Sequence, residues 1–131
     1  MIRFALVWIL LGLLLPGVGL AQMPPLTCGE MQARVTRVVD GDTFDANVSL
    51  GYDVIVTGRF RVLGVNTPER NQPGYVEAKT AVERLLTGQP VAITACRKDS
   101  FGRWLADIKV PEVGDLRQWL LDRKLGVPVQ R

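Results

Sequence analysis

Residues 43–50 alternate strictly between apolar and polar side chains. The apolar positions are Phe44, Ala46, Val48 and Leu50. A period of two is that of a β-strand with one buried face, whereas an amphipathic helix repeats every three to four residues. A strand of this kind needs neighbouring strands and a core that covers its apolar face. The segment therefore restricts the chain to folds that contain a half-buried sheet.

Similar patterns predict four further strands, rich in β-branched or alternating apolar residues, at 33–39, 53–65, 91–96 and 104–110. Between residues 74 and 86 the apolar spacing changes to three and four residues, which predicts a helix. The order is three strands, a helix, two strands and a second helix. This order is typical of a mainly β, α+β fold in which helices pack against a small five-stranded barrel.

The second helix is predicted from its capping residues. Asp115 is a typical N-cap, and Gln118, three residues later, completes a capping box. Arg123 and Lys124 are predicted in the last turn, and Gly126 is predicted to end the helix.

Composition excludes several function classes. The chain has 131 residues, of which 47% are apolar, which suits one domain with a real core. It has no histidine, so Ser-His-Asp triads, histidine-ligated zinc sites and imidazole bases are excluded. Acid–base chemistry must use carboxylates or arginines. The net charge of +3 includes Arg3, and the rest of the chain is mildly basic, which permits a polyanionic substrate without requiring one.

The N-terminus is predicted to be a signal peptide over residues 1–21. Arg3 precedes an apolar run, Pro16 and Gly17 break it, and small residues precede Gln22, where the mature chain is predicted to start. The alternative is an uncleaved membrane anchor, but the run of about a dozen apolar residues is shorter than the ~20 that a spanning helix needs. We therefore expect a protein exported to the periplasm or secreted, with no stable membrane insertion after cleavage.

The mature chain is predicted to consist of a linker, residues 22–32, and one domain, residues 33–131. Its cysteines are Cys28, before the first strand, and Cys96, at the end of the fourth. Outside the cytosol these two cysteines can form a disulfide that ties the N-terminal arm to the barrel. The alternative is a pair of free thiols.

Residues 61–70, RVLGVNTPER, carry the strongest functional signal. Arg61 lies near the end of an apolar strand, and the strand stops at Thr67-Pro68 because proline cannot donate to a ladder and holds its predecessor extended. Glu69 is the next residue after Pro68. The stretch therefore brings a cation and a carboxylate to one region, an arrangement suited to holding a phosphate.

Three motifs together resemble the signature stretches of the thermonuclease family, the staphylococcal-nuclease-like domains: VDGDT at 39–43, RVLGVNTPE at 61–69 and FGR at 101–103. The similarity spans about residues 33–127, with the motifs in the family's order. The resemblance implies an OB-fold, that is, an oligonucleotide/oligosaccharide-binding barrel, with two to three helices. It also implies an endonuclease, a phosphodiester hydrolase that cleaves DNA and RNA with calcium and with low sequence specificity.

The resemblance assigns catalytic roles to three residues. A phosphodiester is an anion that repels hydroxide, so its hydrolysis needs cations on the non-bridging oxygens and a base that orients water. Arg61 and Arg103 match the family's phosphate-binding arginines, and Glu69 matches its proposed general base. Taken singly, Arg61 or Arg103 would more often be a solvated charge at a strand end, and Glu69 after Thr-Pro could simply begin a loop; the joint occurrence at the family spacing favours a phosphate-binding site.

The resemblance also implies a calcium site and a substrate contact. Asp42 matches a calcium ligand, Thr67 matches a residue that binds through its backbone carbonyl, and Asn66 stands where the family usually has aspartate. Losing that carboxylate predicts a weakened calcium site. Phe101 replaces a tyrosine of the staphylococcal protein; it loses a hydroxyl but keeps an aromatic face for stacking on a base.

Two hypotheses follow. The first is an exported, monomeric, calcium-dependent endonuclease that acts on single-stranded DNA or RNA; the joint presence of Asp42, Arg61, Glu69 and Arg103 favours it. The second is a catalytically weak or inactive OB-fold module that only binds nucleic acid, which Asn66 favours.

Overall fold

The computed structural model describes residues 28–129, so the predicted signal peptide lies outside the described residues. Five main strands form the barrel: β1 (Glu30–Asp40), β2 (Thr43–Gly51), β3 (Val54–Val62), β5 (Pro90–Lys98) and β6 (Trp104–Val110). They are ordered β3-β2-β1-β5-β6, and parallel pairing of β3 with β6 closes the barrel. The predicted fold class, a five-stranded OB-like barrel of the α+β type, is confirmed.

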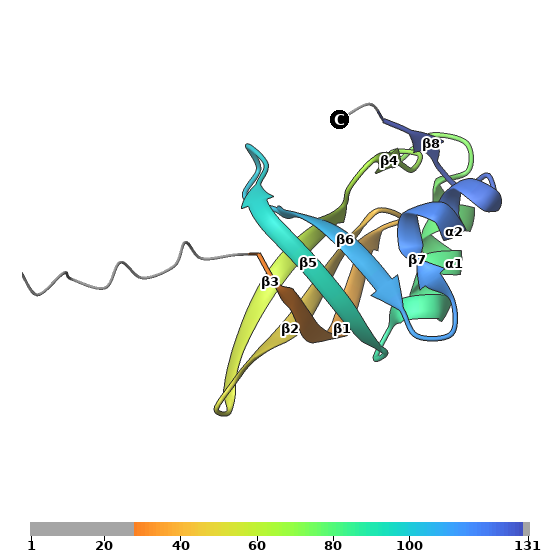
Figure 1. Cartoon of the computed structure of the whole chain (residues 1–131). Coiled ribbons are helices and arrows are strands. Elements are labelled where there is room, and N and C mark those ends of the chain that lie inside the picture. Colours follow the sequence, from red (N-terminus) through yellow and green to blue (C-terminus); the bar gives the residue numbers. More distant parts are fainter. Residues whose placement is uncertain (1–27, 130–131) are drawn as a thin grey trace, which may run out of the picture.

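Two helices and three short strands complete the described chain (Figure 1). Helix α1 spans Tyr75–Leu86 and α2 spans Leu116–Asp122. The short strands are β4 (Val65–Asn66), β7 (Gly114–Asp115) and β8 (Val127–Pro128). Both helices lie at the same side of the barrel in Figure 1, where β4 and β8 also pair. Neither helix is long and apolar enough to cross a membrane.

The core is built from the apolar faces of the barrel strands. Phe44 and Phe60 stack inside it with ring centroids 5.9 Å apart. Helices α1 and α2 contribute the buried side chains of Val82, Leu86 and Leu116 to the same cluster. The apolar alternation of residues 43–50 therefore marks the core face of β2, except that Leu50, near the β2–β3 turn, is half exposed.

Three local predictions differ from the structure. Strand β1 begins at Glu30, inside the predicted linker. The third strand ends at Val62, because Gly64, with φ at 76°, turns the chain into the separate strand β4. Helix α2 ends at Asp122, because Lys124 takes a left-handed conformation with φ at 56°. Arg123 and Lys124 therefore follow the helix instead of forming its last turn.

Gly126 does not end α2; it allows a close contact. A Cβ atom at Gly126 would lie 2.7 Å from Val65 Cγ2, so glycine is needed where the C-terminal segment meets β4. Asp115 is the N-cap of α2 as predicted, and its Oδ1 accepts a hydrogen bond from Gln118 N at 3.0 Å. The reciprocal bond of a capping box is absent, since the Gln118 side chain donates to Asp122.

Cys28 and Cys96 form a disulfide, with their Cα atoms 5.1 Å apart. It joins the segment before β1 to β5, which is the bridged one of the two alternatives that the sequence left open, and it closes a loop with a sequence separation of 68.

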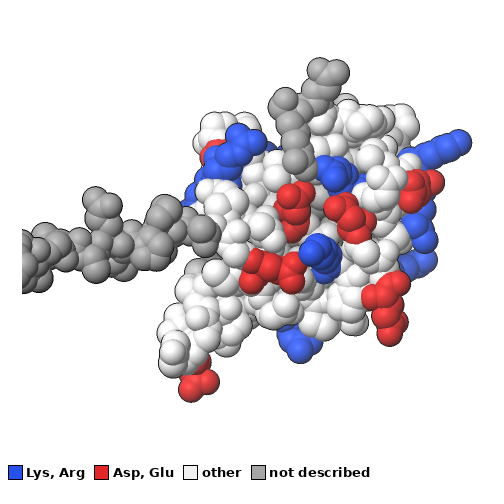
Figure 2. All heavy atoms as spheres, in the orientation of Figure 1, with Lys and Arg blue, Asp and Glu red and all other residues white. Residues whose placement is uncertain are grey.

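Figure 2 shows acidic and basic side chains intermixed on the face that carries β5 and β6. The lobe at the lower left of this view corresponds to the β2–β3 hairpin, and it is white apart from its tip. Since neither sign of charge dominates this face, a polyanion has no general electrostatic preference for it.

Candidate functional site

The turn between β1 and β2 presents a buried carboxylate, Asp42. Its Oδ1 lies 2.8 Å from Arg61 Nη1 and accepts a hydrogen bond from Thr43 Oγ1 at 2.9 Å. Its Oδ2 accepts a hydrogen bond from the backbone N–H of Thr67 at 3.0 Å. Asp42 therefore links the β1–β2 turn, strand β3 and the segment that follows β4.

Gly41 lets this turn approach Thr67. A Cβ atom at Gly41 would lie 2.9 Å from both Cγ2 and Oγ1 of Thr67 and 3.0 Å from Cβ of Ala78 in α1. Glycine is thus required at this position by close approach. The Asp-Gly-Asp-Thr motif fixes a turn, as any Asp-Gly sequence can, but it also delivers Asp42 to Thr67.

Arg61 connects two of the predicted site residues. Its Nη1 pairs with Asp42, and its Nη2 donates a hydrogen bond to Oδ1 of Asn66. Thr67 is buried, and among the described residues its Oγ1 has no hydrogen-bond partner. The guanidinium of Arg61 therefore contacts Asp42 and Asn66, and Thr67 joins the same group of residues through Asp42.

Glu69 lies on the exposed turn that follows. Its backbone N–H donates to Oε1 of Gln72 at 2.8 Å, and Gln72 N donates back to the Glu69 carbonyl at 2.9 Å. No hydrogen bond or ion pair joins the Glu69 carboxylate to any residue in the described part of the chain. The backbone of Glu69 is therefore held, while its side chain is available to water or a ligand.

Arg103 lies at the end of the turn between β5 and β6. In the parallel β3–β6 pair, Arg61 is the partner of Leu105 and Phe60 is the partner of Trp104, so Arg103 immediately precedes the part of β6 that pairs with β3. The Nε of Arg103 lies 2.7 Å from Asp99 Oδ2, and its guanidinium stacks over the exposed ring of Phe101 at 5.2 Å from the ring centroid. Arg103 and Phe101 thus form one unit at the start of β6.

Asp99, which the sequence analysis did not single out, organises this second unit. Besides the Arg103 side chain, it accepts hydrogen bonds from the backbone N–H groups of Phe101 and Arg103. Desolvation opposes ionisation of Asp99, but these hydrogen bonds outweigh it and lower its pKa. An aspartate two residues before a Phe-Gly pair is a turn signal that could have identified it.

The structure divides the predicted site residues into two groups. Asp42, Arg61, Asn66 and Thr67 are in direct contact, and Glu69 follows them in the chain. Arg103 and Phe101 lie in the turn between β5 and β6, and in the described structure no hydrogen bond or ion pair joins Arg103 to Asp42 or Arg61. The pairing of β3 with β6 brings this turn next to β3, because Phe60 is the partner of Trp104, the residue after Arg103.

The oxygen donors match calcium in kind but carry little charge. Calcium prefers carboxylate, carbonyl and amide oxygens, which Asp42, Asn66 and Thr67 offer. Only one of these residues is a carboxylate, and within residues 28–129 no group of three or more His, Cys, Asp or Glu side chains is placed to hold a metal. Arg61 neutralises that single carboxylate. The donor set therefore offers a cation one carboxylate and two neutral oxygen-bearing residues.

Comparison with known proteins adds a functional indication. No protein-family model matches the chain. It is 27% identical over 97 residues to a curated protein of Escherichia coli O157:H7, and equally so to one of Escherichia coli. Both are named "Uncharacterized endonuclease". The match covers 74% of this chain but only 60% of the length of either relative.

Proposed function

We propose that this protein is a nuclease that hydrolyses phosphodiester bonds in nucleic acid, of the thermonuclease-like type. The observation that supports the proposal is the pairing of β3 with β6, in which Arg61 is the partner of Leu105 and Arg103 immediately precedes Trp104, the first residue of β6. Two guanidinium groups carried by neighbouring segments suit the non-bridging oxygens of one phosphate. The similarity to two proteins named as endonucleases supports the same conclusion.

In this proposal each residue has a defined task. Arg61 and Arg103 bind the phosphate and stabilise the charge that grows on it in the transition state. Glu69, whose carboxylate has no partner in the described structure, accepts a proton from water and orients it for attack. The face of Phe101 stacks on a base, and Asp99 keeps Arg103 and Phe101 in place.

We further propose a requirement for calcium, held by Asp42, Asn66 and Thr67. A bound calcium ion would supply Lewis-acid charge to the phosphate. The guanidinium of Arg61 contacts the side-chain oxygens of Asp42 and Asn66. A cation bound to the same oxygens would compete with Arg61 for them. The competition would free Arg61 to turn toward substrate.

A second candidate function is nucleic-acid binding without turnover. It is favoured by the ion pair of Arg61 with Asp42, which occupies the guanidinium, and by the single carboxylate of the metal ligand set. For either function we propose that the mature protein is exported, acts as a monomer outside the cytoplasm and prefers single-stranded DNA or RNA of any sequence.

The deciding experiment measures cleavage of single-stranded DNA by the mature protein, in calcium and in chelator. We expect cleavage only with calcium and a loss of at least ~100-fold in Glu69→Gln, the usual contribution of a general base. Glu77→Gln, an exposed glutamate of α1, is the matched control and should cleave at the wild-type rate. Binding without cleavage under all conditions would favour the second candidate.

A further inference from the structure

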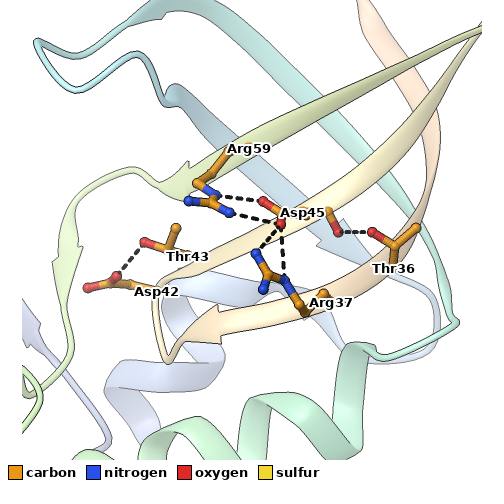
Figure 3. A network of polar contacts seen from close by, with 6 residues as sticks. All are labelled: Thr36, Arg37, Asp42, Thr43, Asp45 and Arg59. Carbon is orange, nitrogen blue, oxygen red and sulfur yellow. Dashed lines mark hydrogen bonds and ion pairs between the residues drawn. The ribbon is translucent and has the colours of Figure 1, made fainter.

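A second arginine cluster lies beside the candidate site. Asp45 of β2 is the register partner of both Arg59 of β3 and Arg37 of β1. Arg59 forms a two-pronged contact with Asp45, Nε to Oδ1 at 2.6 Å and Nη2 to Oδ2 at 3.0 Å. Arg37 reaches the same carboxylate from the other side, with Nη2 2.9 Å from Oδ2 (Figure 3).

A β-bulge in β1 creates this arrangement. The pairing of Val35 with Ala46 is followed by that of Arg37 with Asp45, so one residue of β1, Thr36, is inserted. Val35 is buried, and without the insertion Arg37 would point to the same side, into the core. The bulge turns Arg37 outward to Asp45, and Thr36 Oγ1 secures it by donating to the Asp45 carbonyl at 3.1 Å.

The cluster continues the face that carries Arg61. Arg59 and Arg61 are two residues apart in β3, so both side chains leave the same face, separated by about 7 Å of strand. Their partners in β2 are Asp45 and Thr43, and Thr43 donates to Asp42 (Figure 3). A chain of phosphates that reaches Arg61 along this face meets Arg59 and Arg37 next.

The arginines of the cluster are accessible. Two arginines share direct contacts with one aspartate, while Asp40 acts on Arg59 only through its charge, and the side chains of Arg37 and Arg59 are 65% and 43% exposed. Each uses Nε and Nη2 on Asp45, and in the described structure Nη1 of either residue has no partner. The shared carboxylate limits the rotamers of both side chains, which lowers the entropy that a ligand must overcome to bind them.

We propose that Arg37 and Arg59, held by Asp45, form a second phosphate subsite that binds the backbone of a nucleic-acid strand whose scissile phosphate lies at Arg61. The inference rests on the proposed nuclease function and specifies how substrate is bound. It predicts that affinity grows with strand length, because only a strand longer than the scissile dinucleotide reaches this subsite.

The test uses the mature protein in chelator, so that binding is measured without cleavage. The probes are fluorescent single strands of thymidine, a dinucleotide and a dodecanucleotide, and the readout is anisotropy over a salt series. The variants are Arg37→Gln/Arg59→Gln and the charge-preserving Arg37→Lys/Arg59→Lys. Arg84→Gln, an exposed arginine of α1, is the matched control. Thermal unfolding of every variant establishes that it is folded.

We expect the double Gln variant to bind the dodecanucleotide at least ~10-fold more weakly and to lose about 1.4 from the slope of log affinity against log salt, since each phosphate contact to a single strand contributes ~0.7. The double Lys variant should keep most of the slope, and Arg84→Gln should match wild type. If wild type and the double Gln variant bind the dodecanucleotide with equal affinity and slope, the subsite is refuted. If wild type binds neither strand in chelator and cleaves neither strand in calcium, the proposed function itself fails.

Discussion

Two arginine–aspartate clusters lie close together on this barrel, but water reaches them to different extents. In the pair of Arg61 with Asp42 the side chains are 20% and 7% exposed. In the other cluster Asp45 is 18% exposed, and Arg59 and Arg37 are 43% and 65% exposed. The same ionic chemistry therefore operates in two surroundings.

The difference in burial assigns different tasks to the two clusters. Removing charges from water is costly, so a buried pair is maintained only where hydrogen bonds satisfy its remaining atoms, as Thr43 and Thr67 do for Asp42. Such a pair fixes geometry. An exposed ion pair contributes little to stability but keeps its charges accessible. Under the proposed function, the chemistry therefore belongs to the Arg61 cluster and the electrostatic attraction of substrate to the Arg59 cluster.

The largest expected effect is on the rate of cleavage, which should fall much more when an arginine of the candidate site is removed than when Arg59 is removed. Arg61→Ala and Arg103→Ala should each lower the rate of cleavage of single-stranded DNA by at least ~100-fold, the usual scale for a group that stabilises transition-state charge. Arg59→Ala should lower the rate at saturating substrate far less, because it acts on binding. Steady-state kinetics at a series of substrate concentrations checks this. Equal losses of kcat in Arg59→Ala and Arg61→Ala would contradict the division of tasks.

The second prediction concerns stability. Asp42→Ala leaves Arg61 and the Thr67 N–H without their partner. We expect the free energy of unfolding to fall by about 2–3 kcal/mol. This is somewhat below the usual cost of breaking a fully buried ion pair, because Arg61 is partly exposed. Asp45→Ala is the matched comparison and should cost less than ~1 kcal/mol. Denaturant unfolding measures both. If Asp45→Ala lowered the free energy of unfolding more than Asp42→Ala does, the exposed cluster and not the buried one would be the stabilising ion pair.

The third prediction adds charge to the buried cluster. Asn66→Asp places a carboxylate where the side-chain oxygen of Asn66 accepts a hydrogen bond from Arg61. We expect the half-saturating calcium concentration to fall by about ten- to a hundredfold, which corresponds to ~1–3 kcal/mol of calcium-binding free energy. Calorimetric titration of calcium and the calcium dependence of cleavage both report it. Asn47→Asp, on β2 beyond Asp45, is the control and should leave calcium affinity unchanged. No change in Asn66→Asp would remove calcium from this site.

The sequence predicts the fold well because its strands have local signals. The period of two in residues 43–50 and the helical spacing in 74–86 each reflect one buried face, and the barrel follows from their order. The motifs also named residues that the structure brings into one chain of contacts: Asp42, Arg61, Asn66 and Thr67. The pairing of Cys28 with Cys96 depends on strand register, and the sequence left it open between a bridge and two thiols.

What the sequence did not predict depends on a register shift between paired strands and on left-handed backbone conformations. The Arg37–Asp45–Arg59 cluster exists because a bulge shifts β1 against β2, and alternation alone places Arg37 on the side of Val35. The end of β3 at Val62 and the end of α2 at Asp122 depend on left-handed residues, Gly64 and Lys124. Lysine gives no signal for that conformation, so the boundary of α2 could not be predicted.

The smallest expected effect is the pH dependence of the stability that Asp45 contributes through its ion pairs with Arg37 and Arg59. Hydrogen bonds from Arg59 are the main cause that lowers the pKa of Asp45; burial opposes them, and Arg37 adds to the lowering. The pKa of Asp45 in the folded protein is therefore below that of the unfolded chain. Its contribution to stability should be complete above the ordinary aspartate pKa of ~3.9 and should be lost as the pH falls through the lower folded value.

The measurement is the difference in unfolding free energy between wild type and Asp45→Asn, followed from about pH 6 down to about pH 2. We expect a difference below ~1 kcal/mol at the upper end, reduced further by salt, because water and ions screen an exposed pair. The difference should shrink as Asp45 becomes protonated. A difference that stayed constant down to the lowest pH would show that the carboxylate charge contributes nothing, and that Asp45 acts on Arg37 and Arg59 through hydrogen-bond geometry alone.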